Sequence, residues 1–348
     1  MGIGARRLGV MLLSLLLLGL AGCTRSGGEG PVTVRIGVAL YQQDDTFIST
    51  VVQHLEQLAK EEEQARDIKL NLNIADGRGS QSAQNEQVDR FLAQGYDIIC
   101  VNIVDRTAAA VIIDKAQSAG VPVIFFNREP VEEDLARWEG AYYVGCDGAQ
   151  SGQMQGQIVL DAWQTDPGAL DRNGDGVLQY VMLEGEPGHQ DALLRTENSL
   201  KVLVQAGVPT EKLASDTANW QRGQATTRML QWLERFGAEI EVVFANNDDM
   251  ALGAIDACLD AGLAEDALPF VVGVDATPPA LDAVAEGLLK GTVRNDAAGL
   301  ARSMLDLGCA LAAGEDPGEA VELVDGKYVW LDYATVTRDN LEEFRPAA

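Results

Sequence analysis

The sequence is short of basic residues and has no cysteine motif. Its 348 residues include 26 Lys and Arg against 53 Asp and Glu, a formal net charge of −27. Such a chain is repelled by nucleic acid and by anionic lipid headgroups, which argues against either as a binding surface. No CxxC or Cys/His spacing occurs, so the cysteines after residue 23 are interpreted as buried thiols, with one disulfide left open: Cys100, Cys146, Cys258 and Cys309.

The N-terminal apolar run is too short for a dedicated transmembrane helix. Leu8–Leu20 follows two arginines, which is typical of a signal peptide. The tetrapeptide LAGC that ends at Cys23 resembles the bacterial lipoprotein cleavage box, and the resemblance implies that residues 1–22 are removed and Cys23 is lipidated. Residues 23–31 are rich in Gly and Ser and are expected to be a flexible tether. We therefore expect an extracytoplasmic, lipid-anchored protein. The alternative is an ordinary secreted protein.

Apolar strand patterns alternate with helical periodicity along the rest of the chain. This rhythm predicts an α/β fold with doubly wound parallel sheets, and the length suffices for two such lobes. The expected strands are 34–40, 68–75, 98–103, 123–126, 142–144, 181–183, 242–245 and 270–274, and the expected helices include 47–63, 80–93, 108–119, 191–205 and 222–236.

Polar residues follow the carboxyl ends of the expected strands, where ligands bind in such sheets. Each one alone is better explained as a helix cap. Together with a nearby histidine, aspartate and arginine they predict one cleft for a neutral polyhydroxyl ligand, because carboxylates, amides and a guanidinium pair with adjacent hydroxyls. Phe47 and Trp220 are expected to cover the faces of a sugar ring, with Trp220 serving affinity instead of the core. The candidates at the strand ends are Asp44, Asp45, Asn102, Asn246, Asn247, Asp248, Asp275, Asn295 and Asp296, and the three residues that join them are His189, Asp191 and Arg195.

The helix expected from Asp191 carries two of these polar residues. Asp191 is placed as its N-cap, and Arg195 lies four residues later on the same face. This spacing is weak evidence by itself, because a surface ion pair has the same pattern.

A cation loop precedes that helix. Asp171, Asn173 and Asp175 supply alternate side-chain oxygens, and Gly176 makes the sharp turn of a calcium loop. Val177 offers its carbonyl and Gln179 its amide oxygen. Met182 stands where such a loop ends in a bidentate Glu, so the last carboxylate must come from elsewhere, with Glu239 and Glu241 both available. A solvated Asp/Asn/Gly turn is the alternative to a Ca²⁺ site.

The motifs resemble those of the bacterial D-galactose/D-glucose-binding periplasmic proteins, the sugar receptors of ABC transporters. The resemblance runs from Arg35 to the C-terminus and rests on RIGVALYQQDDTF, NIVD, FFNREP, AYYVG, DRNGDGVLQ, EGEPGHQDALLR, DTANW, VFANND, GVDATP and GTVRND. It implies that Phe47 and Trp220 stack on the sugar and that Glu241 completes the Ca²⁺ site. The polar residues that it implies to bind sugar are Asp45, Asn102, His189, Asp191, Arg195, Asn247, Asp275 and Asn295. Gln190 stands where that family has Pro. The lipid anchor differs from the freely diffusing family type.

The resemblance also implies an architecture and partners. Two lobes would be joined by crossings near residues 120–127, 295 and 331, and closure would bury the sugar. The N-terminal lobe would hold 32–127 and 296–331, and the C-terminal lobe 128–295 and 332–348. The implied ligand is D-glucose or D-galactose and the implied partner an ABC permease. A chemoreceptor or sensor is a further candidate partner.

Other functions fit the residues less well. A glycosidase would use paired carboxylates, but no nucleophile–base pair stands out. A LacI-type repressor shares the fold but needs an N-terminal DNA-binding domain, where this chain has a signal-peptide pattern. A sensing receptor without a permease, or a binding protein for ribose, xylose or another monosaccharide, remains open as an alternative.

Overall fold

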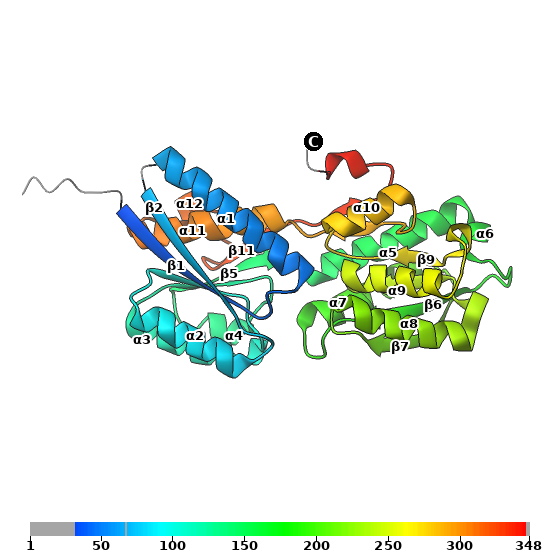
Figure 1. Ribbon diagram of the computed structural model, residues 1–348, viewed down its shortest axis with the longest axis horizontal. Helices are drawn as coiled ribbons and strands as arrows, with labels where there is room; N and C mark the ends of the chain where they lie inside the picture. The colour runs from blue at the N-terminus through cyan, green and yellow to red at the C-terminus, as the bar shows by residue number, and fades with distance from the viewer. Residues whose placement is uncertain (1–31, 67, 346–348) are drawn as a thin grey trace, which may run out of the picture.

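The protein is described from a computed structural model, which covers residues 32–66 and 68–345. The expected signal peptide, Cys23 and the expected tether lie outside the described residues. Two α/β lobes lie side by side (Figure 1). In the described chain no helix is both long and apolar enough to span a bilayer. Cys100, Cys146 and Cys258 are buried, Cys309 is half-buried, and the four form no disulfide with one another.

The first lobe is built on a six-stranded parallel sheet. Its central strands are apolar and buried on both faces, as expected of a covered parallel sheet. Helices α1 (Thr46–Arg66) and α11 (Ala297–Ala313) pack on one face, and α2 (Gln81–Ala93) and α3 (Ala109–Ala119) on the other. The strand order is β11 (Tyr328–Leu331), β5 (Ala141–Cys146), β4 (Val123–Phe126), β3 (Ile98–Val101), β1 (Val32–Leu40) and β2 (Ile68–Asp76).

The second lobe has a four-stranded parallel sheet and an antiparallel pair. The sheet order is β7 (Thr210–Thr217), β6 (Leu178–Glu184), β8 (Val242–Ala245) and β9 (Phe270–Val272), and the pair is β10 (Thr292–Arg294) with β12 (Ala334–Val336). Helices α5 (Gly148–Thr165) and α7 (Gln190–Gln205) cover one face of this sheet. The other face is covered by α8 (Arg222–Phe236), α9 (Asp248–Asp260) and α10 (Pro278–Glu286).

Short elements complete the two lobes. The short helices are α4 (Glu132–Leu135), α6 (Pro167–Leu170) and α12 (Pro317–Ala320), and the 3₁₀ turns are η1 (Arg106–Ala108), η2 (Gly237–Glu239), η3 (Glu265–Ala267) and η4 (Leu341–Glu343).

The first lobe boundary differs from the one expected. The division at residue 127 is wrong, because β5 pairs in parallel with β4 and therefore belongs to the first sheet. The chain first enters the second lobe between Cys146 and Gly148. It crosses again between β10 and α11, at Asn295, and between β11 and β12, after Leu331. A strand pattern at 142–144 does not reveal which sheet the strand joins.

A glycine stripe lets two helices of the second lobe approach closely. Gly148, Gly152 and Gly156 of α5 face α7 at four-residue spacing. A Cβ on Gly152 would lie 2.9 Å from the Cα of Arg195, and one on Gly156 would lie 2.3 Å from the backbone oxygen of Ser199. Since α7 carries Asp191 and Arg195, this close packing fixes the position of the residues expected to bind ligand.

We expect Gly156→Ala to destabilise the protein by roughly 1–3 kcal/mol, because the added methyl group meets backbone that moves only with the whole helix. Urea denaturation at a fixed Ca²⁺ concentration measures the change. Gly223→Ala is the matched control: Gly223 also lies in a helix, its Cβ would meet nothing within 4 Å, and no loss is expected. Equal stabilities of the two variants would contradict the close α5–α7 contact.

Candidate functional site

The expected polar residues gather in a cleft between the lobes, at the carboxyl ends of both sheets. Asp45 follows β1, His189 follows β6, Asn247 follows β8 and Asp275 follows β9. Both lobes contribute, so one ligand in the cleft contacts both. The lining residues are Tyr41, Asp45, Phe47, Ile48, Asn127, Arg128, His189, Asp191, Arg195, Trp220, Asn247 and Asp275.

Two expected residues lie behind this lining. Asn102 is fully buried and its side-chain nitrogen donates to the carbonyl of Phe126 and to the side chain of Asn127, at 3.1 and 3.2 Å. Asn295 donates to Asp275 Oδ1 at 3.4 Å. The Oδ1 atom of Asn102 has no hydrogen-bond partner. In this structure both asparagines therefore support residues that line the cleft.

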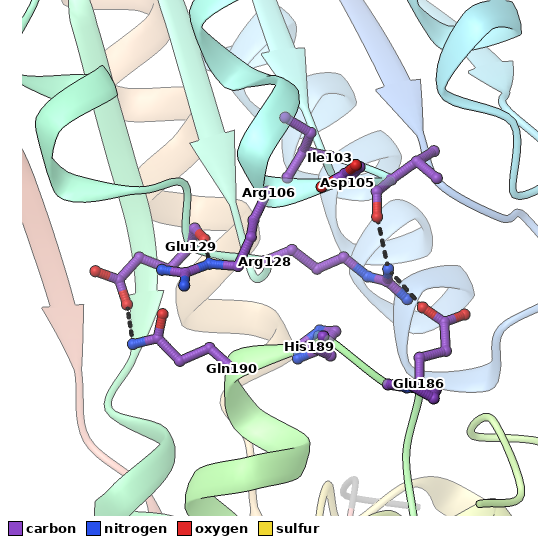
Figure 2. Close-up of a pocket in the computed structure, with 11 residues that line it drawn as sticks. Ile103, Asp105, Arg106, Arg128, Glu129, Glu186, His189 and Gln190 are labelled. Carbon is purple, nitrogen blue, oxygen red and sulfur yellow. Dashed lines mark hydrogen bonds and ion pairs between the residues drawn. The ribbon is translucent and has the colours of Figure 1, made fainter.

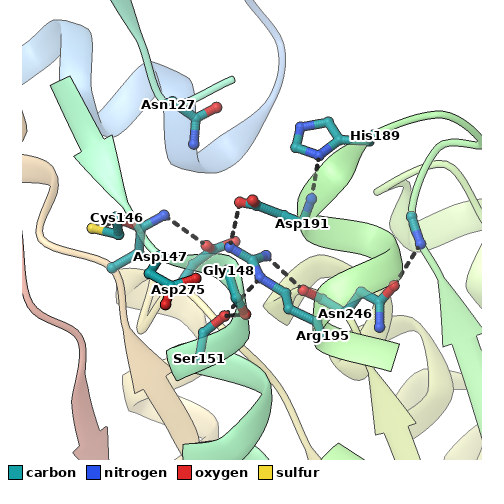
Figure 3. A network of polar contacts seen from close by, with 12 residues as sticks. Asn127, Cys146, Asp147, Gly148, Ser151, His189, Asp191, Arg195, Asn246 and Asp275 are labelled. Atoms are coloured by element: carbon teal, nitrogen blue, oxygen red, sulfur yellow. Dashed lines mark hydrogen bonds and ion pairs between the residues drawn. The ribbon is translucent and has the colours of Figure 1, made fainter. Parts of the chain in front are cut away.

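The guanidinium of Arg195 is the centre of the cleft network (Figure 3). Its Nη2 atom lies 3.2 Å from Asp191 Oδ2 and 3.0 Å from the hydroxyl of Tyr333. Its Nη1 atom donates to the carbonyl of Asn246 at 2.8 Å, and its Nε atom to Ser151 Oγ at 3.1 Å. The side chain is 4% exposed. Every bond runs to a different segment, so the guanidinium has one orientation.

Electrostatics keep this group charged. Burial opposes the charge on Arg195, but neighbours that include Asp191 and Asp275 raise its pKa above the usual value. Burial in turn raises the pKa of Asp191, and that of Asp275 well above the usual range, while Arg195 opposes both shifts. The guanidinium therefore offsets part of the cost of burying the two carboxyl groups.

His189 is the residue that caps α7, in place of the expected Asp191. Its Nδ1 accepts the backbone N–H of Asp191 at 3.1 Å. The N-cap expectation for Asp191 is wrong because the helix begins one residue earlier, at Gln190. Burial and the nearby Arg128 and Arg195 lower the pKa of His189 well below its usual value. The imidazole is therefore neutral at pH 7 and carries its proton on Nε2, which is a donor.

Three non-glycine residues of the cleft have left-handed backbone conformations. The φ angles are 60° at Asn127, 65° at Trp220 and 119° at Asp275. Such residues cost about 1–3 kcal/mol each and concentrate at functional sites, where their surroundings hold them. Their meeting in one cleft supports a binding role for it.

Trp220 has a second role in the fold. It is 8% exposed and belongs to the hydrophobic core of the second lobe. Its ring lies against Gly185, where a Cβ would come within 2.1 Å, and edge-on to His189 at a centroid distance of 5.0 Å. The expectation that Trp220 stands apart from the core is wrong, since the same indole lines the cleft and fills the core.

Sequence reasoning missed part of the lining. Tyr41 donates to Asp45 through its hydroxyl, and Arg128 stacks on the Tyr41 ring at 3.5 Å from its centroid. Asn127 and Arg128 follow β4 directly in the FFNREP motif. Their position at the end of a strand could have identified them as candidates for the cleft. An arginine after a strand, however, also fits a surface turn.

Direct contacts hold the lobes together across the cleft. Thr46 Oγ1 lies 2.6 Å from Asp249 Oδ2. Arg128 Nη1 lies 2.9 Å from Glu186 Oε2, and Gln190 Nε2 lies 2.9 Å from Glu129 Oε2. The structure therefore shows the lobes closed on each other. A ligand that reaches the cleft needs these contacts to open.

A family model described as a periplasmic binding protein domain matches residues 36–316. The chain belongs to the periplasmic binding proteins. This family consists of substrate-binding proteins of transporters, so the protein is a solute-binding protein and not an enzyme, and it acts outside the cytoplasm. The expected α/β two-lobe fold and the resemblance carried by the motifs are confirmed.

Individual relatives cover nearly the whole binding protein. The D-galactose/methyl-galactoside binding periplasmic protein of Haemophilus influenzae is 41% identical over 89% of this chain and 91% of its own length. A putative rhizopine-binding protein of Rhizobium meliloti is 33% identical over 89% and 92%. A solved ABC transporter solute-binding protein of Bacillus halodurans, with bound myo-inositol, is 29% identical, covers 92% of this chain and 99% of that one, and has a TM-score of 0.72.

The calcium-like loop of this binding protein lies in the second lobe, between α6 and β6. Asn173 Nδ2 is 3.1 Å from Asp175 Oδ2 and 3.2 Å from Gln179 Oε1, and Gln179 Nε2 is 2.9 Å from Asp175 Oδ2. These side chains thus converge on one point. The carboxylate of Asp171 accepts backbone N–H groups of the same loop, among them that of Gly176 at 2.8 Å.

Of the two remote carboxylates, Glu241 is the one beside the loop. It is 1% exposed, and its carboxylate accepts the backbone N–H groups of Arg172 at 2.7 Å and Gln179 at 3.0 Å. Glu239 is exposed in η2.

No three His, Cys, Asp or Glu side chains converge as a metal-binding group anywhere in residues 32–66 and 68–345. The oxygen donors here are mixed: carboxylates, two amides and the Val177 carbonyl, a set that suits Ca²⁺.

Proposed function

We propose that the cleft binds D-galactose and D-glucose and that the closed, loaded protein delivers the sugar to an ABC permease. The observation that carries the proposal is the 41% identical relative, which is named for D-galactose and methyl-galactoside binding. The cleft chemistry supports it. A charged guanidinium, a neutral imidazole donor and several carboxyl and amide groups together offer donors and acceptors for a ring of hydroxyls.

We further propose a tether to the membrane by a lipid on Cys23, which rests on the sequence alone. The anchor would keep the protein beside its permease.

A cyclic polyol is the second candidate ligand. The structural relative with bound myo-inositol is 29% identical to this chain, and its ligand presents the same kind of hydroxyl ring. Myo-inositol therefore belongs in every binding assay of this protein. Tighter binding of inositol than of either hexose would replace the hexoses in the proposal.

Asp45 is the residue that we expect to tolerate both hexoses, which differ in the orientation of the hydroxyl at carbon four. Its carboxylate accepts the hydroxyl of Tyr41 and the backbone N–H of Ile48. An ionised carboxylate has about four lone-pair sites, so about two remain for a sugar hydroxyl in either orientation.

We predict that D-glucose and D-galactose bind within about tenfold of each other, which is about 1.4 kcal/mol. Asp45→Asn should weaken both and widen the gap, because the new amide places a donor opposite the Tyr41 hydroxyl or the Ile48 N–H. Asp44→Asn, at an exposed neighbouring carboxylate, is the control for charge and should leave both affinities unchanged. Calorimetric titration measures them. A parent preference above about a hundredfold would contradict the role given to Asp45.

We also propose that Ca²⁺ binds Asp171, Asn173, Asp175, Val177 through its carbonyl, Gln179 and Glu241. The loop residues converge, and the buried Glu241 carboxylate has backbone N–H donors but no ion pair within the described chain that would balance its charge. The metal would join the loop to the strand region before β8 and so stabilise the second lobe by mass action.

Removal of Ca²⁺ by a chelator should therefore lower the melting temperature and leave sugar binding detectable. Glu241→Gln should weaken Ca²⁺ binding at least about tenfold, the cost of one lost charged ligand of about 1.4 kcal/mol or more. Glu239→Gln, which changes the same residue type outside the loop, should bind Ca²⁺ like the parent. Calorimetry with Ca²⁺ and thermal unfolding test this. A metal-free parent that binds no Ca²⁺ would disprove the site.

A further inference from the structure

A second cavity lies beside the sugar cleft. We call it the side chamber (Figure 2). It lies between the loops that follow β3 and β4 of the first lobe and the β6–α7 loop of the second. Its volume is ≈ 250 Å³, whereas the space left between the side chains of the closed cleft is ≈ 30 Å³. The lining residues are Ile103, Val104, Asp105, Arg106, Arg128, Glu129, Glu186, Pro187, Gly188, His189 and Gln190.

The side chamber adjoins the cleft. His189 and Arg128 line both spaces. A group that extends from a sugar in the cleft would therefore have to pass the side chains of His189 and Arg128 to enter the side chamber. Both lobes line the chamber, so the hinge movement that closes the cleft also encloses such a group.

The lining is polar and carries charged groups of both signs. Arg106 Nε donates to the carbonyl of Glu129 at 3.0 Å, and Arg128 pairs with Glu186. Burial raises the pKa of Glu129, which accepts a hydrogen bond from Gln190. The other amide atom, Gln190 Oε1, is buried and has no hydrogen-bond partner. The guanidinium groups of two arginines and the carboxyl groups of Asp105, Glu129 and Glu186 together suit a neutral ligand rich in hydroxyls, as in the cleft.

We propose that the side chamber binds a second sugar unit, so that the ligands of this protein include disaccharides that contain galactose or glucose. The proposal rests on the proposed hexose site, which would hold the first unit. A hydroxyl of the second unit would donate to Gln190 Oε1, and the arginines would donate to its oxygens. An unpaired buried acceptor costs free energy, so a hydroxyl placed there gains affinity.

Two substitutions separate the side chamber from the cleft. Gln190→Pro removes the side-chain amide and is compatible with the fold, since proline suits the first position of a helix and α7 begins at Gln190. Arg106→Ala removes a chamber donor that does not line the cleft. Thr46→Ala is the control, because it removes the Thr46–Asp249 contact between the lobes and leaves the side chamber intact.

The experiment titrates the parent and the three variants with galactose, glucose, lactose, melibiose, maltose and gentiobiose. These disaccharides join hexoses through different carbons, so the orientation of the first unit need not be known. At least one disaccharide should bind the parent within about a hundredfold of the better hexose. Gln190→Pro and Arg106→Ala should weaken that disaccharide at least about fivefold more than the hexose. Thr46→Ala should weaken both by the same factor.

Several results would overturn the inference. If galactose or glucose binds and no disaccharide does, the side chamber takes no sugar while the hexose site stands. The same conclusion follows if the chamber variants weaken hexose and disaccharide equally. If neither hexose binds, the proposed function fails and the inference fails with it.

Discussion

The buried charge of Arg195 is the constraint on which the binding cleft depends. A guanidinium removed from water needs partners for its donors and a negative charge nearby. The partners come from separate parts of the chain: Asp191 one turn earlier on α7, Ser151 near the start of α5, and Tyr333 just after the last crossing. Two of these segments follow crossings between the lobes. The orientation of Arg195 is therefore coupled to the hinge.

The close packing of α5 and α7 makes this arrangement possible. The glycines of α5 bring its backbone against the turns of α7 that carry Asp191 and Arg195, and a Cβ on Gly148 would lie 2.7 Å from Asp191 Oδ1. Small residues at one helix face thus determine where the polar residues of the other helix stand. Asn247 is fixed in a similar way, because its side chain caps α9 by accepting the N–H of Met250 at 3.0 Å.

The sequence predicted those features of the fold and the site that depend on neighbouring residues, and it missed features that depend on tertiary contacts. The parallel α/β alternation came from apolar strand patterns. The strand ends pointed to groups of polar residues that include Asp45, Asn247 and Asp275, and the resemblance chose among the members of each group. Sheet membership is not local, and so β5 was assigned to the wrong lobe. The strand β7 was missed because its half-exposed sequence TEKLASDT lacks an apolar pattern. Such a sequence is typical of a strand at the edge of a sheet, where β7 lies. Asn102 and Asn295 stand at strand ends too, but only packing decides that they turn behind the lining.

The closed lobes give a direct prediction of where a sugar binds. Determination of the crystal structure with D-galactose is the most direct test. One hexose is expected in the cleft, with hydrogen bonds of about 2.7–3.2 Å to Arg195 in the second lobe and to Asp45 in the first. A hexose that contacts only one lobe, or that lies outside the cleft, would contradict a site built from both lobes around Arg195.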